Sequence, residues 1–336
     1  MRLRGVLLAI VVAPALVGSA TTAATARTGR DYFSFRDPSI TESSGVVASS
    51  IRDGIYYTHN DSGGLPELFA VDDLGCTLTR YDLVDADGEP LTPWTDVEDI
   101  ARGPHHGESV LWLGDIGDNN HQRREIAVYR VTEPNANASS HGQSGGCPST
   151  DVQPATATTY RLAYPDTPHD AETLLADPTD GRLYVVTKFP AHHALVYAAP
   201  LELDADSVNV LELVGAFAFP PSTTYDRDPA EALQAEPPRL EQGLLPQTPF
   251  DFAARLWAVG GDVHPNRERI VIRTYSDAWE WTVAEGQSLG DALTTGVPTQ
   301  TPLIYERQGE AIAYARSGSF LVTTCEDVGC TAHRYD

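Results

Sequence analysis

The chain has 336 residues, with 47 acidic against 23 basic side chains and a net charge of −24. That charge disfavours nucleic acid and anionic membranes as partners and is compatible with cation binding. The length allows one large domain or two ordinary ones.

Residues 1–26 have the pattern of a cleaved signal peptide. Two arginines precede an apolar run over 6–17, and Ala24-Thr25-Ala26 supplies an A-x-A cleavage site, with Ala20 as an earlier alternative. The run is too short to span a membrane, and no other apolar stretch approaches about 20 residues. We therefore expect a secreted, extracellular and monomeric protein without a membrane span.

The rest of the chain is dominated by strand signals. Short runs of β-branched and aromatic residues alternate with Gly, Pro, Asp and Asn, and they fall into five sets that each begin with acidic or small residues. The predicted strands are 45–48, 55–58, 68–71 and 78–83; 97–101, 110–113, 126–131 and 158–163; 173–176, 183–187, 195–198 and 210–219; Val263, 270–275, 279–283 and 303–305; and 311–314, 320–324 and 331–335.

Repetition at this spacing is typical of a β-propeller. The last set lacks an outer strand, and Tyr32–Arg36 supplies a spare strand before the first set. We predict an all-β, single-domain propeller over 27–336, with five four-stranded blades and the N-terminal strand closing the last blade. Residues 220–252 read as an insertion with a short helix at 229–235; a sixth, degenerate blade within 220–256 is the alternative.

In a propeller the starts of the inner strands and the turns between the second and third strands share one face. Acidic residues recur at these positions, among them Asp61, Asp96 and Glu326, and only Lys188 and Arg273 offset them. Ca²⁺ takes six to eight oxygen ligands and suits such a set. The predicted calcium ligands are Glu42, Glu98, Asp99, Asp170, Glu172, Asp262 and Glu310. The alternative interpretation is that these acids cap strands and turns.

Two functions remain open for this face. The favoured one is a calcium-stabilised extracellular scaffold that binds a small molecule or another extracellular ligand and carries out no reaction. The alternative is a metal-assisted hydrolase of esters, phosphoesters or lactones, in which His59 or Glu172 acts as the catalytic base. A glycosidase is a weaker third possibility, because it needs two suitably separated carboxyl groups.

Four cysteines in an exported chain predict two disulfide bonds. Cys76 and Cys147 fall in corresponding turns of adjacent blades, and Cys325 and Cys330 flank one turn. We predict these two pairs.

Several segments resemble a family of secreted actinobacterial β-propeller proteins, mostly of unassigned activity. The matching segments are ESSG from Glu42, THNDSGG from Thr58, VEDIA from Val97, GDIGDN from Gly114, DAETLLADP from Asp170, VGGDVHP from Val259 and QGEAIAY from Gln308. More distantly, the acidic inner strands are similar to those of phytase-like and esterase-like propellers. That resemblance implies calcium binding and ester or phosphoester hydrolysis, but those propellers have six blades and a basic phosphate pocket that this chain lacks.

Overall fold

The computed structural model describes residues 27–61, 63–136, 146–188, 193–220 and 256–336. Within them the chain is mostly β, with one short helix, α3. The predicted signal peptide, nearly all of the 220–252 insertion and the 229–235 helix lie outside the described residues. No helix in the described part of the chain is long and apolar enough to cross a membrane.

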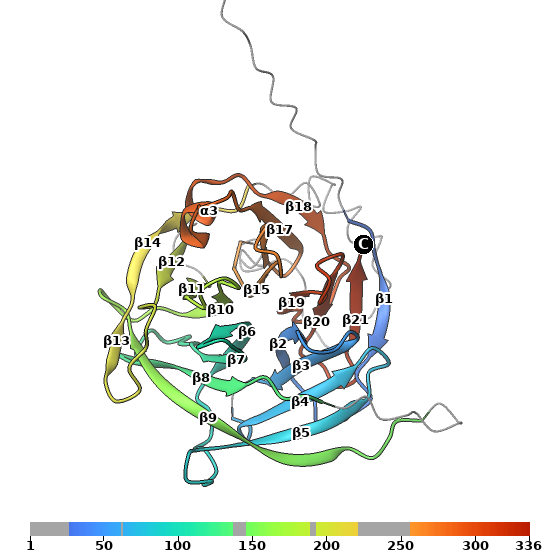
Figure 1. The fold of residues 1–336 in the computed structure, drawn as a ribbon. Helices are drawn as coiled ribbons and strands as arrows, with labels where there is room; N and C mark the ends of the chain where they lie inside the picture. Colours follow the sequence, from blue (N-terminus) through green and yellow to red (C-terminus); the bar gives the residue numbers. More distant parts are fainter. Residues whose placement is uncertain (1–26, 62, 137–145, 189–192, 221–255) are drawn as a thin grey trace, which may run out of the picture.

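Five groups of strands surround a common centre (Figure 1). The first contains β2 (Ser43–Ala48), β3 (Ile55–Asn60), β4 (Glu67–Asp72) and β5 (Thr77–Val84). The second contains β6 (Val97–His105), β7 (Glu108–Asp115), β8 (Ile126–Thr132) and β9 (Asp151–Ala163). The third contains β10 (Ala171–Ala176), β11 (Leu183–Thr187), β12 (Ala194–Ala198) and β14 (Glu212–Phe217). The fourth contains β15 (Gly260–Val263), β16 (Arg269–Arg273), β17 (Asp277–Thr282) and β18 (Thr299–Pro302). The fifth contains β19 (Ala311–Tyr314), β20 (Leu321–Thr324), β21 (Thr331–Tyr335) and β1 (Gly29–Ser34).

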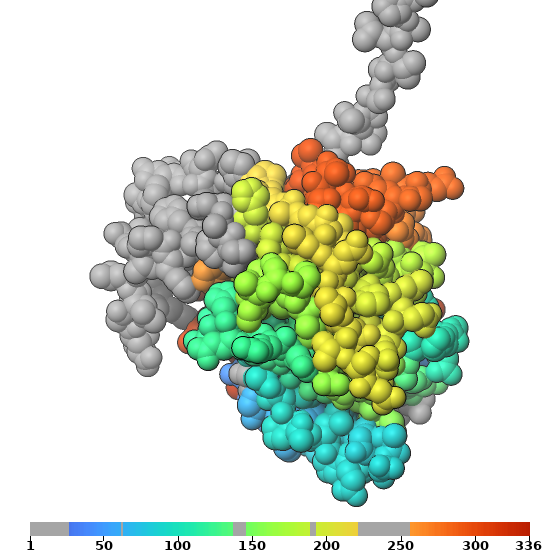
Figure 2. Space-filling view, turned by 90° about the vertical axis from the view of Figure 1, so that its left-hand side faces the viewer, coloured from blue at the N-terminus to red at the C-terminus, as the bar shows by residue number. Residues whose placement is uncertain are grey.

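Within each group the strands are antiparallel and follow one another in chain order, except that β1 comes from the N-terminus. The first strand of each group lies nearest the centre (Figure 1), and these inner strands contact one another in a closed cycle, β2–β6–β10–β15–β19–β2. Figure 2 shows the molecule from the side, with the yellow outer strands of the third group between the orange fourth group and the cyan first group.

Within the described ranges, five apolar clusters fill the spaces between neighbouring groups. Each draws its side chains from two consecutive groups, for example Leu113 with Tyr57 and Leu174 with Trp112. The remaining clusters join the third to the fourth group, the fourth to the fifth, and the fifth to the first. Each face of a sheet is therefore covered by its neighbour near the centre, which explains why inner strands such as β2 and β10 are buried on both sides, whereas outer strands such as β14 are largely exposed.

The N-terminal strand completes the last group, as predicted. β1 pairs antiparallel with β21, from Gly29 opposite Tyr335 to Ser34 opposite Thr331. Phe33 packs in the apolar cluster between the fifth and first groups. The two ends of the described chain are therefore held in one sheet, and the edge of β21 is covered.

Parallel pairing joins the first two groups at their outer edges. β9 pairs in parallel with β5, from Thr79 opposite Asp151 to Val84 opposite Thr156, so that the two groups belong to one nine-stranded sheet. The ninth strand is the short β13 (Val208–Val210), which pairs in parallel with β9. The sequence predicted only 158–163 of β9, because 151–157 includes Pro154 and has few β-branched or aromatic residues.

Further details differ from the sequence expectations. The single strand predicted at 210–219 is two strands, β13 and β14, and the closing strand β1 covers Gly29–Ser34 rather than 32–36. β18 lies at Thr299–Pro302 rather than at 303–305. The helix α3 (Leu289–Thr295) was not expected, although Ser288 caps it by accepting a hydrogen bond from the backbone of Asp291. Its buried residues, among them Leu289 and Leu293, pack into the cluster between the third and fourth groups.

Candidate metal centre

In all five groups, the start of the inner strand lies beside the end of the second strand. The register pairs are Ser43 with Asn60, Val97 with Asp115, Ala171 with Thr187, Gly260 with Arg273, and Ala311 with Thr324. We call the side of the molecule that carries these pairs the acidic face. Their common position is what the sequence predicted for the acidic residues.

Three of the inner strands begin with a β-bulge at the same place. The pairing skips one residue, which is Ser44 in β2, Glu98 in β6 and Glu172 in β10. A bulged residue has no partner opposite, and bulges commonly redirect a side chain beside a functional site. The acidic face therefore receives its central side chains from the irregular first positions of these strands.

Asp61, Asp96 and Glu98 form a compact cluster of carboxylates. One oxygen from each lies within 4.8 Å of the others, an arrangement that can hold a metal ion. The backbone N–H of Asp61 is held by the Glu42 carbonyl at 3.0 Å. Gly117 leaves the space that the other two carboxylates fill, since a Cβ there would lie 2.2 Å from Glu98 Oε1 and 2.5 Å from Asp96 Oδ2.

The cluster holds more negative charge than its surroundings stabilise. Glu98 is 3% exposed, and burial raises its pKa well above the usual range, with the charges of Asp61, Glu310 and Asp96 adding to the shift. No residue within the described ranges donates a hydrogen bond to its carboxylate. Burial also raises the pKa of Asp96. A cation would compensate these charges.

A second pair of carboxyl groups, Glu310 and Glu326, lies beside the cluster. Tyr275 donates a hydrogen bond to Glu310 Oε1 at 2.6 Å, and Ser44 donates to Glu310 Oε2 at 3.4 Å. Burial and the charge of Glu310 raise the pKa of Glu326 to about 9, and the Asp61 charge contributes to the rise. The Glu326 carboxyl group therefore carries a proton at neutral pH, beside Glu310.

Lys188 is the only lysine of the chain and lies next to this region. Its ammonium group forms an ion pair with Glu172 and lies 5.4 Å from the centre of the Trp257 ring. The second oxygen of Glu172, Oε2, is buried without a hydrogen-bond partner among the described residues. Lys188 lowers the pKa of Glu98, but one ammonium group does not balance the surrounding carboxylates.

Two of the predicted calcium ligands bind backbone N–H groups instead. Asp99 is fully buried and accepts hydrogen bonds from Ile100 at 2.8 Å, Leu174 at 2.9 Å and Gly261 at 3.3 Å. It thereby links β6, β10 and β15. Asp262 links β15 to β19 by accepting from the backbone of Tyr314 at 2.8 Å.

The remaining predicted ligands lie at different distances from the cluster. Asp170 accepts a hydrogen bond from the Asp118 backbone at 2.8 Å, and its charge raises the pKa of Asp96. Glu310 belongs to the neighbouring pair described above. The side chain of Glu42 is exposed. Of the seven predicted ligands, the structure places Glu98 alone inside the three-carboxylate cluster.

The predicted base His59 is completely buried. Its ring packs edge-on against Trp94, its Nδ1 lies 3.0 Å from the Asn60 carbonyl oxygen, and burial lowers its pKa to about 4. Arg273, expected as an open cation, is also completely buried. It forms an ion pair with Glu306 at 2.9 Å and donates to the Ala311 carbonyl. Neither side chain is available to a ligand on the acidic face.

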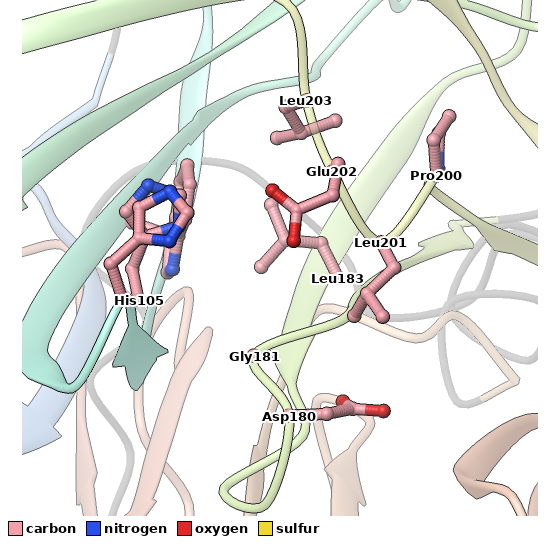
Figure 3. A pocket seen from close by; sticks show the side chains of 10 residues that line it. His105, Asp180, Gly181, Leu183, Pro200, Leu201, Glu202 and Leu203 are labelled. Carbon is pink, nitrogen blue, oxygen red and sulfur yellow. The ribbon is translucent and has the colours of Figure 1, made fainter.

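A small pocket lies at the opposite end of β6 (Figure 3). His105 faces Glu202 across it, and its volume is about 40 Å³. Among the described residues, the carboxylates of Asp61, Asp96 and Glu98 are the only three such groups that converge closely enough for a metal ion. The acidic face therefore provides the better candidate.

The sequence located the face but missed several members of the site. Asp61 and Asp96 were recognised as acidic-face residues, yet they were not among the predicted ligands. Gly117 and Tyr275 were missed altogether. The segment GDIG begins at Gly114 and ends at Gly117. The N–H of Gly117 donates to the Asp96 carbonyl beside the start of β6, so this second glycine is the sequence signal that could have indicated the site. Both disulfide bonds have the predicted pairing, Cys76–Cys147 and Cys325–Cys330.

No protein-family model matches this chain, and no curated protein matches it.

Proposed function

We propose that the chain is a five-bladed β-propeller secreted from the cell. Support comes from five groups of four strands, five apolar clusters between consecutive groups, and the closed cycle of inner strands. The N-terminal strand supplies the fourth strand of the last blade. Two disulfide bonds are typical of proteins that work outside the cytosol.

We infer that Asp61, Asp96 and Glu98 bind Ca²⁺ at the centre of the acidic face. The observation on which this rests is their convergence within 4.8 Å around a Glu98 carboxylate that is buried and receives no hydrogen bond from the described residues. Burying such a charge is costly unless a partner compensates it. A divalent cation can contact all three carboxylates and offset two of their charges.

Calcium suits this site better than the other common cations. The ligands are carboxylates on a bulge and on connections between strands, which favours the flexible geometry of Ca²⁺ over the strict octahedron of Mg²⁺. Zinc prefers nitrogen and sulfur ligands, and all four cysteines are in disulfide bonds. Three carboxylates leave coordination positions of Ca²⁺ for water or for a ligand.

The function that follows is calcium-dependent binding of an extracellular ligand. An oxygen atom of the ligand would complete the coordination of Ca²⁺, and Tyr275 and Lys188 lie beside the cluster to contact the rest. We prefer this function to metal-assisted hydrolysis because neither proposed base suits the reaction. His59 is completely buried, and Glu172 is paired with Lys188.

Calcium titration of the purified protein tests this proposal. A ligand that binds only the native state stabilises it by about 2.7 kcal/mol at a hundredfold excess over Kd. For a chain of this size, that corresponds to a rise in melting temperature of about 5 °C. Chelation should remove the rise, and Mg²⁺ should restore it less well than Ca²⁺.

Two variants locate the site. Glu98→Gln keeps the shape and removes one ligand charge, so we expect calcium affinity to fall by about tenfold or more. Gly117→Ala should also weaken binding, because the added methyl group would displace the Glu98 and Asp96 carboxylates. Gly64→Ala is the matched control, since its Cβ would meet only the Asp61 carbonyl oxygen at 3.9 Å. Calcium affinity that is equal in all three variants would overturn the assignment.

A further inference from the structure

A groove on the acidic face lies outside the metal centre. It has a volume of about 540 Å³, which is in the range of small-ligand sites. One wall comes from the connection between β7 and β8, with His121, Gln122 and Arg124; the other comes from the connection between β9 and β10, with Tyr164, Asp166, Thr167 and Pro168. We call this the side groove.

The first wall is held in place by hydrogen bonds within its own loop. The Asp118 carboxylate accepts from the backbones of Gln122 at 3.0 Å and Arg123 at 2.7 Å. His121 adopts a left-handed backbone, with φ of 51°, and its N–H donates to the Asp118 carbonyl at 2.8 Å. The loop is therefore positioned before any ligand arrives, which reduces the entropy cost of binding.

The second wall is fixed by a set of polar and aromatic side chains. The Tyr197 hydroxyl lies 2.9 Å from His169 Nε2 and also donates to Asp166. The Tyr164 ring packs edge-on against the rings of His169 and Tyr197, with centroids 4.9 and 4.8 Å apart. Burial alone would raise the pKa of Asp166, but hydrogen bonds from His169, Thr167 and Tyr197 hold it below its ordinary value. Asp166 is therefore an ionised acceptor at neutral pH.

The groove presents a guanidinium group, that of Arg124, in a strongly acidic protein. Arg124 and His121 are exposed, and their side chains make no ion pair or hydrogen bond with any described residue. An unpaired guanidinium group is well suited to a carboxylate, which it can bind in a bidentate manner. The ligand of this groove is therefore expected to carry an anionic group at the Arg124 end.

The remaining lining residues suit a ring that bears hydroxyl groups. Tyr164 and Pro168 offer apolar surface for the face of a ring. Gln122, Asp166 and Thr167 offer planar amide and carboxylate groups and a hydroxyl, which can exchange hydrogen bonds with ligand hydroxyls. A fully apolar ligand would leave these polar groups without partners on binding, at a cost in affinity.

We propose that the side groove binds an acidic saccharide, a sugar ring that bears a carboxylate. The carboxylate pairs with Arg124, the ring lies against Tyr164 and Pro168, and the hydroxyls bond to Asp166 and Gln122. This inference does not depend on the proposed calcium site. The two sites are connected only indirectly, since Asp118, which holds the first wall, donates to Asp170 beside the metal centre.

Calorimetric titration of the intact protein with sodium digalacturonate tests the inference, with neutral galactobiose as the comparison sugar. Both titrations are run in EDTA, so that a cation at the centre cannot contribute. We expect digalacturonate to bind at least tenfold more tightly than galactobiose. Arg124→Gln should abolish that preference by lowering the affinity for digalacturonate to that for galactobiose.

Arg30→Gln is the matched control, because it removes the same charge from an exposed side chain on β1. It should bind both sugars like the parent protein. Equal affinity for the two sugars, no binding of either, or a preference that survives Arg124→Gln would overturn the inference. A third titration replaces the EDTA with Ca²⁺: digalacturonate binding that is seen only there and is insensitive to Arg124→Gln would place the saccharide at the metal centre and would also overturn the inference.

Discussion

At the scale of single residues, Asp262 shows how a buried carboxyl group serves the strands rather than a ligand. Its two oxygens accept hydrogen bonds from the backbones of Val263 and Tyr314, both at 2.8 Å. Burial nevertheless raises its pKa to about 6, against the opposing effects of these hydrogen bonds and of the Arg102 charge. The group therefore takes up a proton in the native state at mildly acidic pH.

The raised pKa of Asp262 predicts a pH dependence of stability. Between pH about 4 and 6 the native state binds a proton that the unfolded chain has already lost, so the free energy of unfolding should fall as pH rises through this window. The fall should be at most about 3 kcal/mol and should level off above pH 6. Asp262→Asn has no proton to lose, so its stability should lack this component.

Urea unfolding of both proteins at pH 4, 5, 6 and 7, in chelator, measures the difference. The stability of the parent protein relative to Asp262→Asn should decline from pH 4 to 6. A difference that stays constant with pH would contradict the assigned pKa.

Neighbouring residues also explain why the sequence could identify the acidic face but not the ligand set. Glu98 and Asp99 are adjacent and equally acidic. The bulge directs Glu98 toward Asp61 and Asp96, whereas Asp99 is directed at the backbones of β10 and β15. Strand periodicity places a residue on a face, but it does not show where pairing is interrupted.

At the scale of elements, the two disulfide bonds should make different contributions. Cys76–Cys147 closes a separation of 71 residues, and Cys325–Cys330 closes a separation of 5. The loop-entropy model gives about 4 kcal/mol for the first and about 2 kcal/mol for the second, as upper values. The second bond also closes the turn that bears Glu326, beside the metal centre.

Replacing each pair by serine separates these contributions. The Cys76→Ser, Cys147→Ser variant should lose more stability, whereas the Cys325→Ser, Cys330→Ser variant should lose less stability but more calcium affinity. Melting temperature and calcium titration together give both quantities. The prediction would be contradicted if the Cys325→Ser, Cys330→Ser variant lost more stability but less calcium affinity than the other variant. The turn that bears Glu326 would then make no contribution to calcium binding.

The elements that the sequence predicted well are those with strong local signals. β-branched and aromatic runs located nearly all of the strands in the described ranges. The parallel pairing of β5 with β9 was not predicted, because it joins Thr79 to Asp151 across 72 positions and leaves no local pattern. The helix α3 was missed because Gly290 interrupts an otherwise helical run.

At the scale of the whole molecule, the cycle of sheets depends on one strand from the other end of the chain. Deleting residues 27–34 would remove β1, expose the edge of β21 and remove Phe33 from its cluster. An uncovered strand edge is a template for association. We therefore expect the shortened protein to melt at a markedly lower temperature and to form oligomers.

A synthetic peptide covering residues 27–36 should reverse both effects by adding back the missing strand. Light scattering after gel filtration reports the oligomers, and calorimetry reports the melting temperature. A shortened protein that stays monomeric with an unchanged melting temperature would show that the closure is dispensable.

The bulges at the starts of β2, β6 and β10 have a consequence for evolution. Because Ser44, Glu98 and Glu172 have no partner on the next strand, strand pairing places no demand on their identity. Ser44 already places a neutral hydroxyl at one of these equivalent positions, and Glu98 and Glu172 place carboxylates at the other two. Single substitutions there change the charge at the centre by one unit while leaving every strand in register. The charge at the centre can therefore diverge among descendants without any change in the architecture.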